Sequence, residues 1–590
     1  MLSEIRVEPT RLKWLGFKHL LICLFAYLPL AEAHVGSSGV IVQKQAGKYQ
    51  VLISIQPPDV VPGTASIRVF VEQGRISAIG ARPVYFDAGD KGAPTHDTLR
   101  RTRDGQYEGD VWLMASGSSS IELTINGPDG RQPVIVPIMA QATALREMPK
   151  GTGFGLALMG ILLIIMLVTI IGASNADALV LPGRLIPVTL QHRRREGMTI
   201  GLVLITLLLT GWRFWWNERA TDYKDVQLYQ PTPIHASAQI QHAQRHLTIQ
   251  FTTASFGQNR RNQRTISYLI PDHGKLMHTF LVRMPGLDAF AHLHPDRRDT
   301  LHYDAVLPSL PGGKYLLYTD IVYRNGFTET LTDTVNVPTL KISAEAAVRV
   351  KPSDPDDSWL ITEPMGVKAN AIDIPHLDND MVVCGKPSVS TKLIDSESTA
   401  PAKVRLSDRL GEFPLSKPNA SGLMMYWMDK AAPILEAGKV YTLKFAVADS
   451  TGKPAPLEPY MGMSGHAVVM RSDGTVYIHL HPVGTYSMAA EGSLVNRIAD
   501  TTRTFHYPKA AYFRDSIDRY LATLKALPED QRNQLLMETP GMNHPMKTNN
   551  MVEFPYAFPR AGHYRIWVQV KREGRILTGV FDAQVNDQVL

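Results

Sequence analysis

Two long apolar stretches limit most strongly what this chain can fold into. Residues 152–176 contain no charged side chain, and residues 197–216 contain only Arg213, close to their end. About 20 apolar residues in a helix are enough to cross the hydrocarbon core of a bilayer. Two helices buried in a soluble core are the alternative, which the length of both stretches disfavours. We therefore predict a two-helix transmembrane hairpin within residues 146–217.

The charges around these stretches predict the orientation of the hairpin. Arg184 and residues 193–195, all arginines, lie between the two stretches, and basic residues favour the cytoplasmic side of a membrane. Residues 1–33 have the basic start, apolar run and small-residue end of a secretory signal peptide. We therefore expect a protein of the bacterial inner membrane with most of the chain in the periplasm.

The composition argues against several other classes of protein. The chain has 590 residues and a net charge of +6, from 61 basic and 55 acidic side chains, which is too balanced to predict a nucleic-acid partner. Its two cysteines cannot form a disulfide framework or an iron–sulfur site. The sequence has no phosphate-binding loop, nucleophile elbow or His-Glu-x-x-His motif. We expect a protein that is not an enzyme, and an enzyme using a three-histidine metal with an open position stays an alternative.

The rest of the chain has the short alternating strands and Pro/Gly-rich turns of β structure. We predict a mainly β protein with three immunoglobulin-like β-sandwich domains, at residues 34–145, 225–340 and 421–590. Residues 341–420 are rich in Pro, Ser and Asp, and we interpret them as a linker or extension. Apolar residues at helical spacing in residues 509–539 predict a small helical insertion in the last domain.

The second and third β domains contain the same pattern of residues. In the second, His278 starts a strand that is followed by a turn and by Ala-Phe-Ala-His-Leu-His-Pro at residues 289–295. In the third, His466 starts a strand that is followed by a turn and by Val-Tyr-Ile-His-Leu-His-Pro at residues 476–482. Similarity of this kind within one chain indicates a duplication.

The repeated pattern holds three histidines in each domain. They are His278, His292 and His294 in the second domain, and His466, His479 and His481 in the third. Residues i and i+2 of a strand share one face, and the preceding strand of a hairpin lies beside them. Each trio can therefore converge on one metal ion, which predicts one site in each domain. The alternative is a structural strand end whose imidazoles bond backbone carbonyls.

Neighbouring residues suggest which metal such a site would hold. Aligning His278 with His466 places His273 beside Met461, and Met463 follows two residues later. Imidazole suits copper and zinc, and the thioether of methionine favours Cu(I). We therefore predict copper as the metal, with zinc less favoured, and add His273, Met461 and Met463 to the candidate ligands.

These runs resemble bacterial periplasmic proteins with YtkA-like and FixH-like immunoglobulin-type domains, which are associated with copper and cytochrome oxidase maturation. The resemblance rests on residues 277–283 with 288–295, and on residues 457–466 with 479–482, where Met-Gly-Met-Ser-Gly-His is nearest to the family pattern. It implies copper handling or delivery in the periplasm, with a membrane or periplasmic partner such as an oxidase or a metal transporter. A scaffold of a membrane complex with structural histidines is the alternative function.

Overall fold

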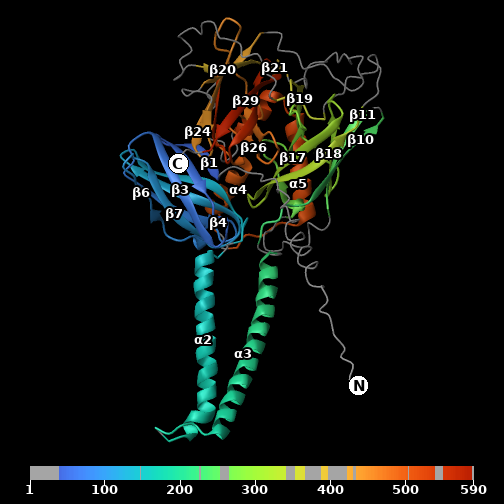
Figure 1. The fold of residues 1–590 in the computed structure, drawn as a ribbon. Coiled ribbons are helices and arrows are strands. Elements are labelled where there is room, and N and C mark those ends of the chain that lie inside the picture. The colour runs from blue at the N-terminus through green and yellow to red at the C-terminus, as the bar shows by residue number, and fades with distance from the viewer. Residues whose placement is uncertain are drawn as a thin grey trace, which may run out of the picture.

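The fold is described from a computed structural model of the chain. The described residues are 39–145, 148–181, 183–224, 228–242, 244–252, 265–339, 353–365, 387–395, 422–428, 434–501, 504–537 and 549–587. The predicted signal peptide lies outside them. The described part is mainly β structure, as predicted, with two long helices that extend away from the β body (Figure 1).

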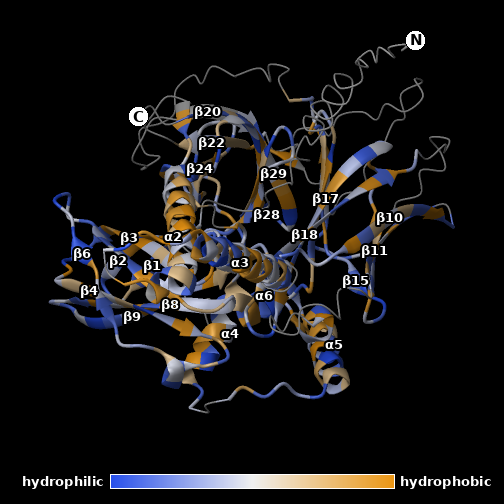
Figure 2. Cartoon of the chain, turned by 60° about the horizontal axis from the view of Figure 1, so that its bottom comes forward, coloured by the Kyte–Doolittle hydropathy of each residue, from blue (hydrophilic) through white to orange (hydrophobic). Residues whose placement is uncertain are grey.

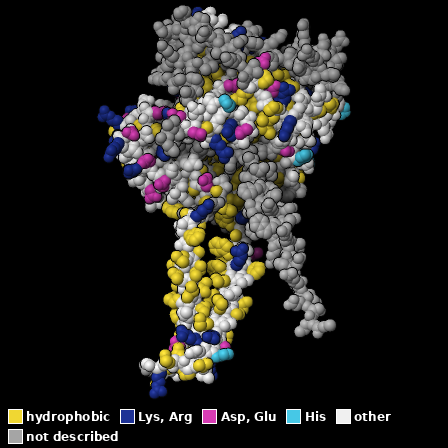
Figure 3. Space-filling model, viewed as in Figure 1, with side chains coloured by type: hydrophobic (Ala, Val, Ile, Leu, Met, Phe, Trp, Pro, Cys, Tyr) yellow, Lys and Arg dark blue, Asp and Glu magenta, His cyan; other side chains and the backbone are white. Residues whose placement is uncertain are grey.

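The two long helices correspond to the apolar stretches of the sequence. They are α2 (Lys150–Ala176) and α3 (Val188–Asp222), and each is long and apolar enough to cross a membrane. Most of their apolar side chains are exposed. Hydrophobic residues run along both helices (Figure 2), and apolar side chains cover much of the visible face between their ends (Figure 3). Small residues bring the helices together, because a Cβ on Gly172 would lie 2.4 Å from the Met198 side chain. The long apolar segments predicted from the sequence are thus present as a helical hairpin.

The second helix begins earlier than its apolar stretch. Residues 193–195 were expected in a loop between the helices, but they lie in the first turns of α3. Their arginines are good helix formers, so the helix continues beyond the apolar segment. Basic side chains gather at the end of the hairpin far from the β body (Figure 3).

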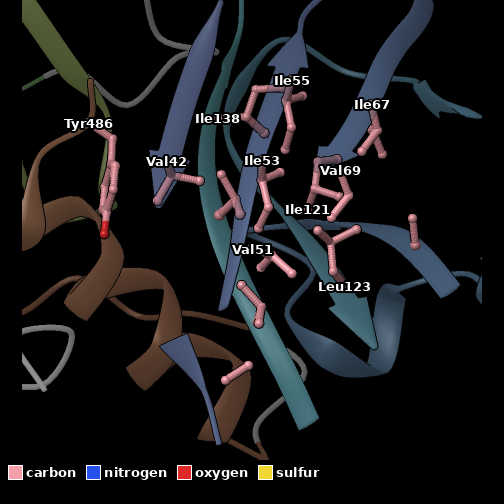
Figure 4. Close-up of a cluster of buried hydrophobic side chains, with 14 of the residues drawn as sticks. Val42, Val51, Ile53, Ile55, Ile67, Val69, Ile121, Leu123, Ile138 and Tyr486 are labelled. Carbon is pink, nitrogen blue, oxygen red and sulfur yellow. The ribbon is translucent and has the colours of Figure 1, made fainter. Parts of the chain in front are cut away.

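The first β unit contains two sheets around one core. In spatial order, one sheet consists of β1 (Val40–Ala46), β2 (Tyr49–Gln56), β3 (Gly63–Gln73), β7 (Tyr107–Leu113) and β6 (Arg100–Arg101). The other consists of β5 (Asp97–Thr98), β4 (Ala78–Tyr85), β8 (Gly117–Gly127) and β9 (Gly130–Ala140). Alternate residues such as Val51, Ile53 and Ile55 point into the core between the sheets (Figure 4). A short 3-10 turn lies at Asp90–Gly92 and another follows α2 at Asp177–Leu179.

The second β unit also contains two sheets. One consists of β10 (Ile234–Gln241), β11 (Gln244–Phe251), β16 (His302–Leu307) and β15 (Asp296–Arg297). The other consists of β12 (Leu269–Ile270), β17 (Gly313–Tyr323), β13 (His278–Arg283), β14 (Ala289–Leu293) and β19 (Ser358–Ile361), with β18 (Thr328–Val337) also paired to β17. A 3-10 turn at Ile266–Tyr268 precedes β12.

The third β unit repeats this arrangement. One sheet consists of β20 (Pro387–Lys392), β22 (Met424–Met428), β24 (Val440–Ala448) and β27 (Met551–Ala557). The other consists of β21 (Ile394–Asp395), β29 (Arg575–Asn586), β28 (Gly562–Arg572), β25 (His466–Arg471) and β26 (Tyr477–Leu480), with β23 (Ile434–Glu436) parallel to β29. The described parts of the segment interpreted as a linker, residues 341–420, include strands β19, β20 and β21 of the two units. The immunoglobulin-like type of the three units stays a prediction.

Three helices follow β26 in the third unit. They are α4 (Met488–Ala499), α5 (Ala510–Ala526) and α6 (Glu529–Met537). The last two match the helical insertion predicted from the sequence. The first was not predicted, although Ser487 caps it by accepting a hydrogen bond from the Ala490 amide. Tyr486, just before α4, lies beside Val42 of β1, so this segment joins the third unit to the first (Figure 4).

The duplicated sheets of the second and third units face one another. Phe280 and Phe290 of the second unit pack in one cluster with Val468, Tyr477 and Trp567 of the third. Phe290 stacks on Trp567 with ring centroids 4.9 Å apart, and the rings of Tyr318 and Tyr477 stack at 4.0 Å. The four strands β13, β14, β25 and β26 are therefore buried on both faces, one toward their own core and one toward the other unit.

Candidate metal centre

Strand alternation puts the six repeated histidines on the face between the units. His278 and Phe280 of β13 point toward the third unit, while Leu281 packs in the core of the second. On β26, Tyr477 and His479 share a face, and Leu480 packs in the core of the third unit. The histidines therefore continue the same faces that carry the aromatic interface. Their positions are His278 and His292 in β13 and β14, His466 and His479 in β25 and β26, and His294 and His481 directly after the second strands.

A seventh histidine comes from a tight turn before β13. His273 and Gly274 have positive φ angles of 49° and 77°, and the turn is closed by two backbone hydrogen bonds between Asp272 and Lys275. Met461 and Gly462 have φ angles of 50° and 78° in the corresponding turn before β25. The turns are thus equivalent, and the alignment of His273 with Met461 describes the same structural position in both units.

The seven imidazoles form one buried cluster between the two units. Rings within the second unit lie close together, with centroids of His292 and His294 4.5 Å apart. Rings within the third unit are equally close, because His479 and His481 are 4.6 Å apart. Contacts also cross between units, at 5.4 Å from His278 to His479. All seven side chains are buried.

Two groups of three histidines have nitrogens close enough for a shared ion. In each group, the three candidate ligand atoms lie within 4.8 Å of one another, and imidazole nitrogens sit about 2.0–2.1 Å from a bound metal. One group belongs to the second unit alone. The other combines residues of both units, because its third member comes from the turn before β13. The groups are His278, His292 and His294, and His273, His466 and His481.

This grouping differs from one trio in each unit. The third unit was expected to use His479 with His466 and His481, but His273 of the second unit takes the third place in that group. The His273 ring is 4.8 Å from the His481 ring and 5.5 Å from the His466 ring. His479 lies between the groups, 5.3 Å from His466 and 5.7 Å from His292. No local pattern of residues predicted that a turn of one unit would face the other.

Five of the seven histidines have ring nitrogens that lack a hydrogen-bond partner. Both nitrogens of His273 and His466 are unpartnered, as are the Nε2 atoms of His294, His479 and His481. A buried polar atom without a partner is destabilising by about 1–3 kcal/mol. Seven such atoms in one cluster are an unusual concentration. Each neutral ring keeps one N–H, so bound cations would take one lone pair from each of these five rings.

In the three rings where only the Nε2 atom is unpartnered, the Nδ1 atom contacts a group outside the cluster. His294 Nδ1 lies 3.0 Å from an Asp357 carboxylate oxygen, and His481 Nδ1 lies 3.0 Å from the Tyr486 carbonyl. His479 Nδ1 lies 3.4 Å from Asp320. A metal-binding histidine usually donates the N–H of its other ring nitrogen to such a carboxylate or carbonyl, which orients the ligating nitrogen toward the ion.

His278 and His292 face each other across a short gap. His278 Nε2 lies 3.1 Å from the Asp272 carbonyl, and His292 Nδ1 lies 3.0 Å from the Gln569 side-chain oxygen. Both acceptors require a protonated nitrogen, which leaves His278 Nδ1 and His292 Nε2 with lone pairs only 3.3 Å apart. Two neutral rings with these tautomers repel each other, and a cation between them removes the repulsion.

Burial favours the neutral, metal-binding form of most rings in the cluster. The pKa values of His278, His292, His466 and His479 are well below the ordinary histidine value, because burial disfavours the charged ring and neighbouring histidines add repulsion. The pKa of His481 is lowered to about 4 by burial and by His273. Neutral imidazole is the form that binds metals, so little proton competition is expected near neutral pH.

An acidic loop beside the cluster contains functional candidates that sequence reasoning missed. His294, Asp354 and Asp357 form a third group of potential ligands. Asp357 also accepts a hydrogen bond from the His294 backbone amide. The signal was the run Asp-Pro-Asp-Asp at residues 354–357, which we interpreted as part of a linker. Its distance in sequence from His294 hid the contact.

The two methionine candidates lie in apolar surroundings. Met461 packs in a small cluster with Tyr460 and Ile576. Met463 belongs to the large core cluster of the first unit, together with Tyr486. Tyr460 itself meets His466 edge to face at 5.1 Å, which places this turn at the border of the histidine cluster. Their role as ligands stays a prediction.

A family model matches the part of the chain that contains three of the seven clustered histidines. Residues 421–511 match a model described as a domain of unknown function (DUF8832). That range includes the third-unit histidines of the cluster and the unpredicted helix α4. No curated protein matches the sequence.

Solved structures similar to the chain share little sequence with it. A tetra-tandem repeat in the extending region of a large adhesion protein is 9% identical, with a TM-score of 0.14, covering 90% of this chain and 98% of that one. The FN1-FN3 domains of chicken CNTN1 are 6% identical, with a TM-score of 0.13 and coverages of 93% and 99%. An Escherichia coli alpha-2-macroglobulin is 9% identical, with a TM-score of 0.16, and this chain covers 44% of it.

Proposed function

We propose that this chain is a membrane-anchored copper-binding protein that handles or delivers copper in the periplasm. The observation that carries this proposal is the arrangement of ring nitrogens in the histidine cluster. In five of the seven rings, one nitrogen contacts a carboxylate, carbonyl or amide oxygen outside the cluster. The other nitrogen of each of these rings either has no hydrogen-bond partner or faces a neighbouring histidine. A structural role for the histidines would satisfy both nitrogens instead.

Copper fits the cluster better than zinc does. The two three-histidine groups offer nitrogen ligands, and Cu(II) binds such sites more tightly than the other divalent metals of the first transition series. Structural zinc favours closed tetrahedral sites with cysteine or with four ligands. Zinc is therefore the second candidate, and a direct competition between the two ions distinguishes them.

The membrane anchor and the burial of the cluster support handling rather than catalysis. Two apolar helices tether the β body, and the charge pattern of the hairpin supports a periplasmic position for that body. All seven histidines are buried, so an organic substrate has little access to them. A membrane or periplasmic partner, such as an oxidase or a metal transporter, would receive the copper.

The test is the copper content of the full chain in detergent. We expect up to two copper ions per chain, one for each three-histidine group, and a preference for copper when zinc is present in equal amount. The double variant His292→Gln, His481→Gln alters one ligand in each group and is expected to lose most of this copper. Circular dichroism and thermal unfolding report whether the variant keeps the fold.

A matched control uses a histidine outside the cluster. His235 is exposed on β10, so His235→Gln should bind as much copper as the unaltered chain. The proposal is wrong if the unaltered chain binds no copper, or if the folded double variant still binds as much copper as the control. Binding of zinc alone would keep the site and replace the metal.

A further inference from the structure

A small pocket opens beside the histidine cluster, between the acidic loop and the helical insertion. It has a volume of about 100 Å³. One wall is the turn that carries His273, and another is the loop with Asp354 and Asp356. Leu524 and Lys525 of α5 and Arg532 of α6 also line it, and the Lys525 side chain is 44% exposed. The pocket therefore lies between the helices and the buried centre.

The pocket is next to both groups of histidines. His273, which belongs to the mixed group, lines it directly with a fully buried side chain. Neither of its ring nitrogens forms a hydrogen bond, and Nε2 lies 3.5 Å from a carboxylate oxygen of Asp272. Asp354, also in its wall, shares a potential ligand group with His294 of the second-unit group. A cation in the pocket would thus be next to His273 of the mixed group and to Asp354, which neighbours His294 of the second-unit group.

A lysine occupies the place that a cation would take. The Lys275 ammonium contacts carboxylate oxygens of Asp354 and Asp356, the latter at 2.8 Å, and its side chain is only 9% exposed. Arg532 lies farther out, 3.8 Å from Asp356. Two carboxylates and three basic side chains thus line the pocket. Lys275 balances the carboxylates, Arg532 lies near Asp356, and Lys525 pairs with Asp296 instead.

We propose that this pocket is the route by which a metal cation reaches and leaves the histidine cluster, with Lys275 as a displaceable counter-charge. An arriving cation is drawn by Asp356 and Asp354, takes the place of the Lys275 ammonium and passes to His273 or His294. Departure uses the reverse sequence, in which Lys275 returns to the carboxylates. This inference rests on the proposed copper-binding function, and concerns the rate of transfer rather than the final affinity.

The test measures the rate of Cu(II) uptake by the full chain in detergent, using stopped flow and quenching of tryptophan fluorescence. Asp356 is outside the groups of potential ligands, so Asp356→Asn should leave the copper content unchanged and slow uptake by about tenfold or more, because local negative charge raises cation on-rates. Arg532→Gln removes positive charge from the pocket and should speed uptake. It serves as the second variant should Asp356→Asn fail to fold.

The control removes a carboxylate elsewhere on the surface. Glu553 of β27 pairs with Lys444 and is about one-third exposed, so Glu553→Gln should not change the rate. Unchanged uptake rates in both pocket variants, with full copper content, would overturn the route while leaving the proposed function standing. Absence of copper from the unaltered chain would overturn both.

Discussion

The second and third β units are copies that supply unequal parts of one centre. Their strands place three histidines each at equivalent positions, and their preceding turns have nearly the same backbone angles. However, the turn of the second unit carries His273, which joins the histidines of the other copy, whereas the turn of the third carries Met461. The two units thus share one framework, and the residue at one position of the turn, His273 or Met461, differs between them.

The residues that support the histidines also differ between the two units. Asp320 is the cross-strand neighbour of His278, and Gln569 is the cross-strand neighbour of His466. Each supports a histidine of the opposite unit, Asp320 holding His479 and Gln569 holding His292. The supports therefore cross between the copies, one as a carboxylate and one as an amide. The mixed group therefore requires both units in contact, and the second-unit group takes its Gln569 support from the other unit.

The largest expected effect separates the two groups. Altering His294, in the second-unit group, and altering His466, in the mixed group, should each remove one of two bound copper ions from the full chain. His294→Gln and His466→Gln are compared by copper content after gel filtration. Loss of both ions from either single variant would show one shared site in place of two. His235→Gln is the matched control.

The next effect tests the turn that distinguishes the copies. His273→Met gives both turns the same side chain and should weaken Cu(II) at the mixed group by at least about tenfold, because a nitrogen ligand is lost. Cu(I) binding should fall less, since a thioether suits that ion. Competition with Cu(I) and Cu(II) chelators measures both. Equal affinities before and after the change would show that His273 is not a ligand. An isolated third unit, which lacks His273, is expected to bind Cu(II) as weakly as the variant.

The smallest effect concerns pH and the metal-free chain. The folded-state pKa values of His278, His292, His466, His479 and His481 lie below the usual value near 6.5, so the unfolded chain binds more protons as the pH falls. The free energy of unfolding therefore has its full value above about pH 6.5 and decreases as the pH falls below that value. Each histidine contributes a decrease of up to about 1.4 kcal/mol per pH unit, and for His481 the decrease continues to about pH 4.

Thermal unfolding between pH 7.5 and 5 measures this slope. Copper should flatten it in the upper part of the range, since the ligands are then held by metal. Replacement of His466 and His479 by Gln should reduce the slope of the metal-free chain, while His235→Gln should not. A slope that is the same with and without the cluster histidines would contradict their burial in the neutral form.

Local sequence patterns predicted the parts of the centre that depend on neighbouring residues. The spacing of His292 and His294 follows from strand alternation, and the pairing of β13 with β14 follows from the intervening turn. The alternation of apolar residues also predicted the mainly β fold and the two long helices. These features are set within about 15 residues of sequence, where periodicity determines which side chains share a face.

Contacts between distant segments could not be predicted in this way. His273 reaches the third unit because two strand faces pack together through Phe290 and Trp567, and a strand buried on both faces shows no polar side in its sequence. Asp357 reaches His294 because β19 joins the edge of the second unit beside β14. The composition of residues 351–357 is typical of a linker, so only the tertiary fold reveals them as part of the centre.

The hairpin of helices is an insertion with closely spaced ends. Ala142, before α2, and Leu228, after α3, form a parallel bridge, and the Tyr229 amide donates to the Ala142 carbonyl at 2.7 Å. The segments before α2 and after α3 are thus hydrogen-bonded to each other within the β body. Replacement of residues 146–225 by a short flexible linker should remove the two apolar helices without disturbing the β body, and should yield the whole histidine cluster in a form that needs no detergent.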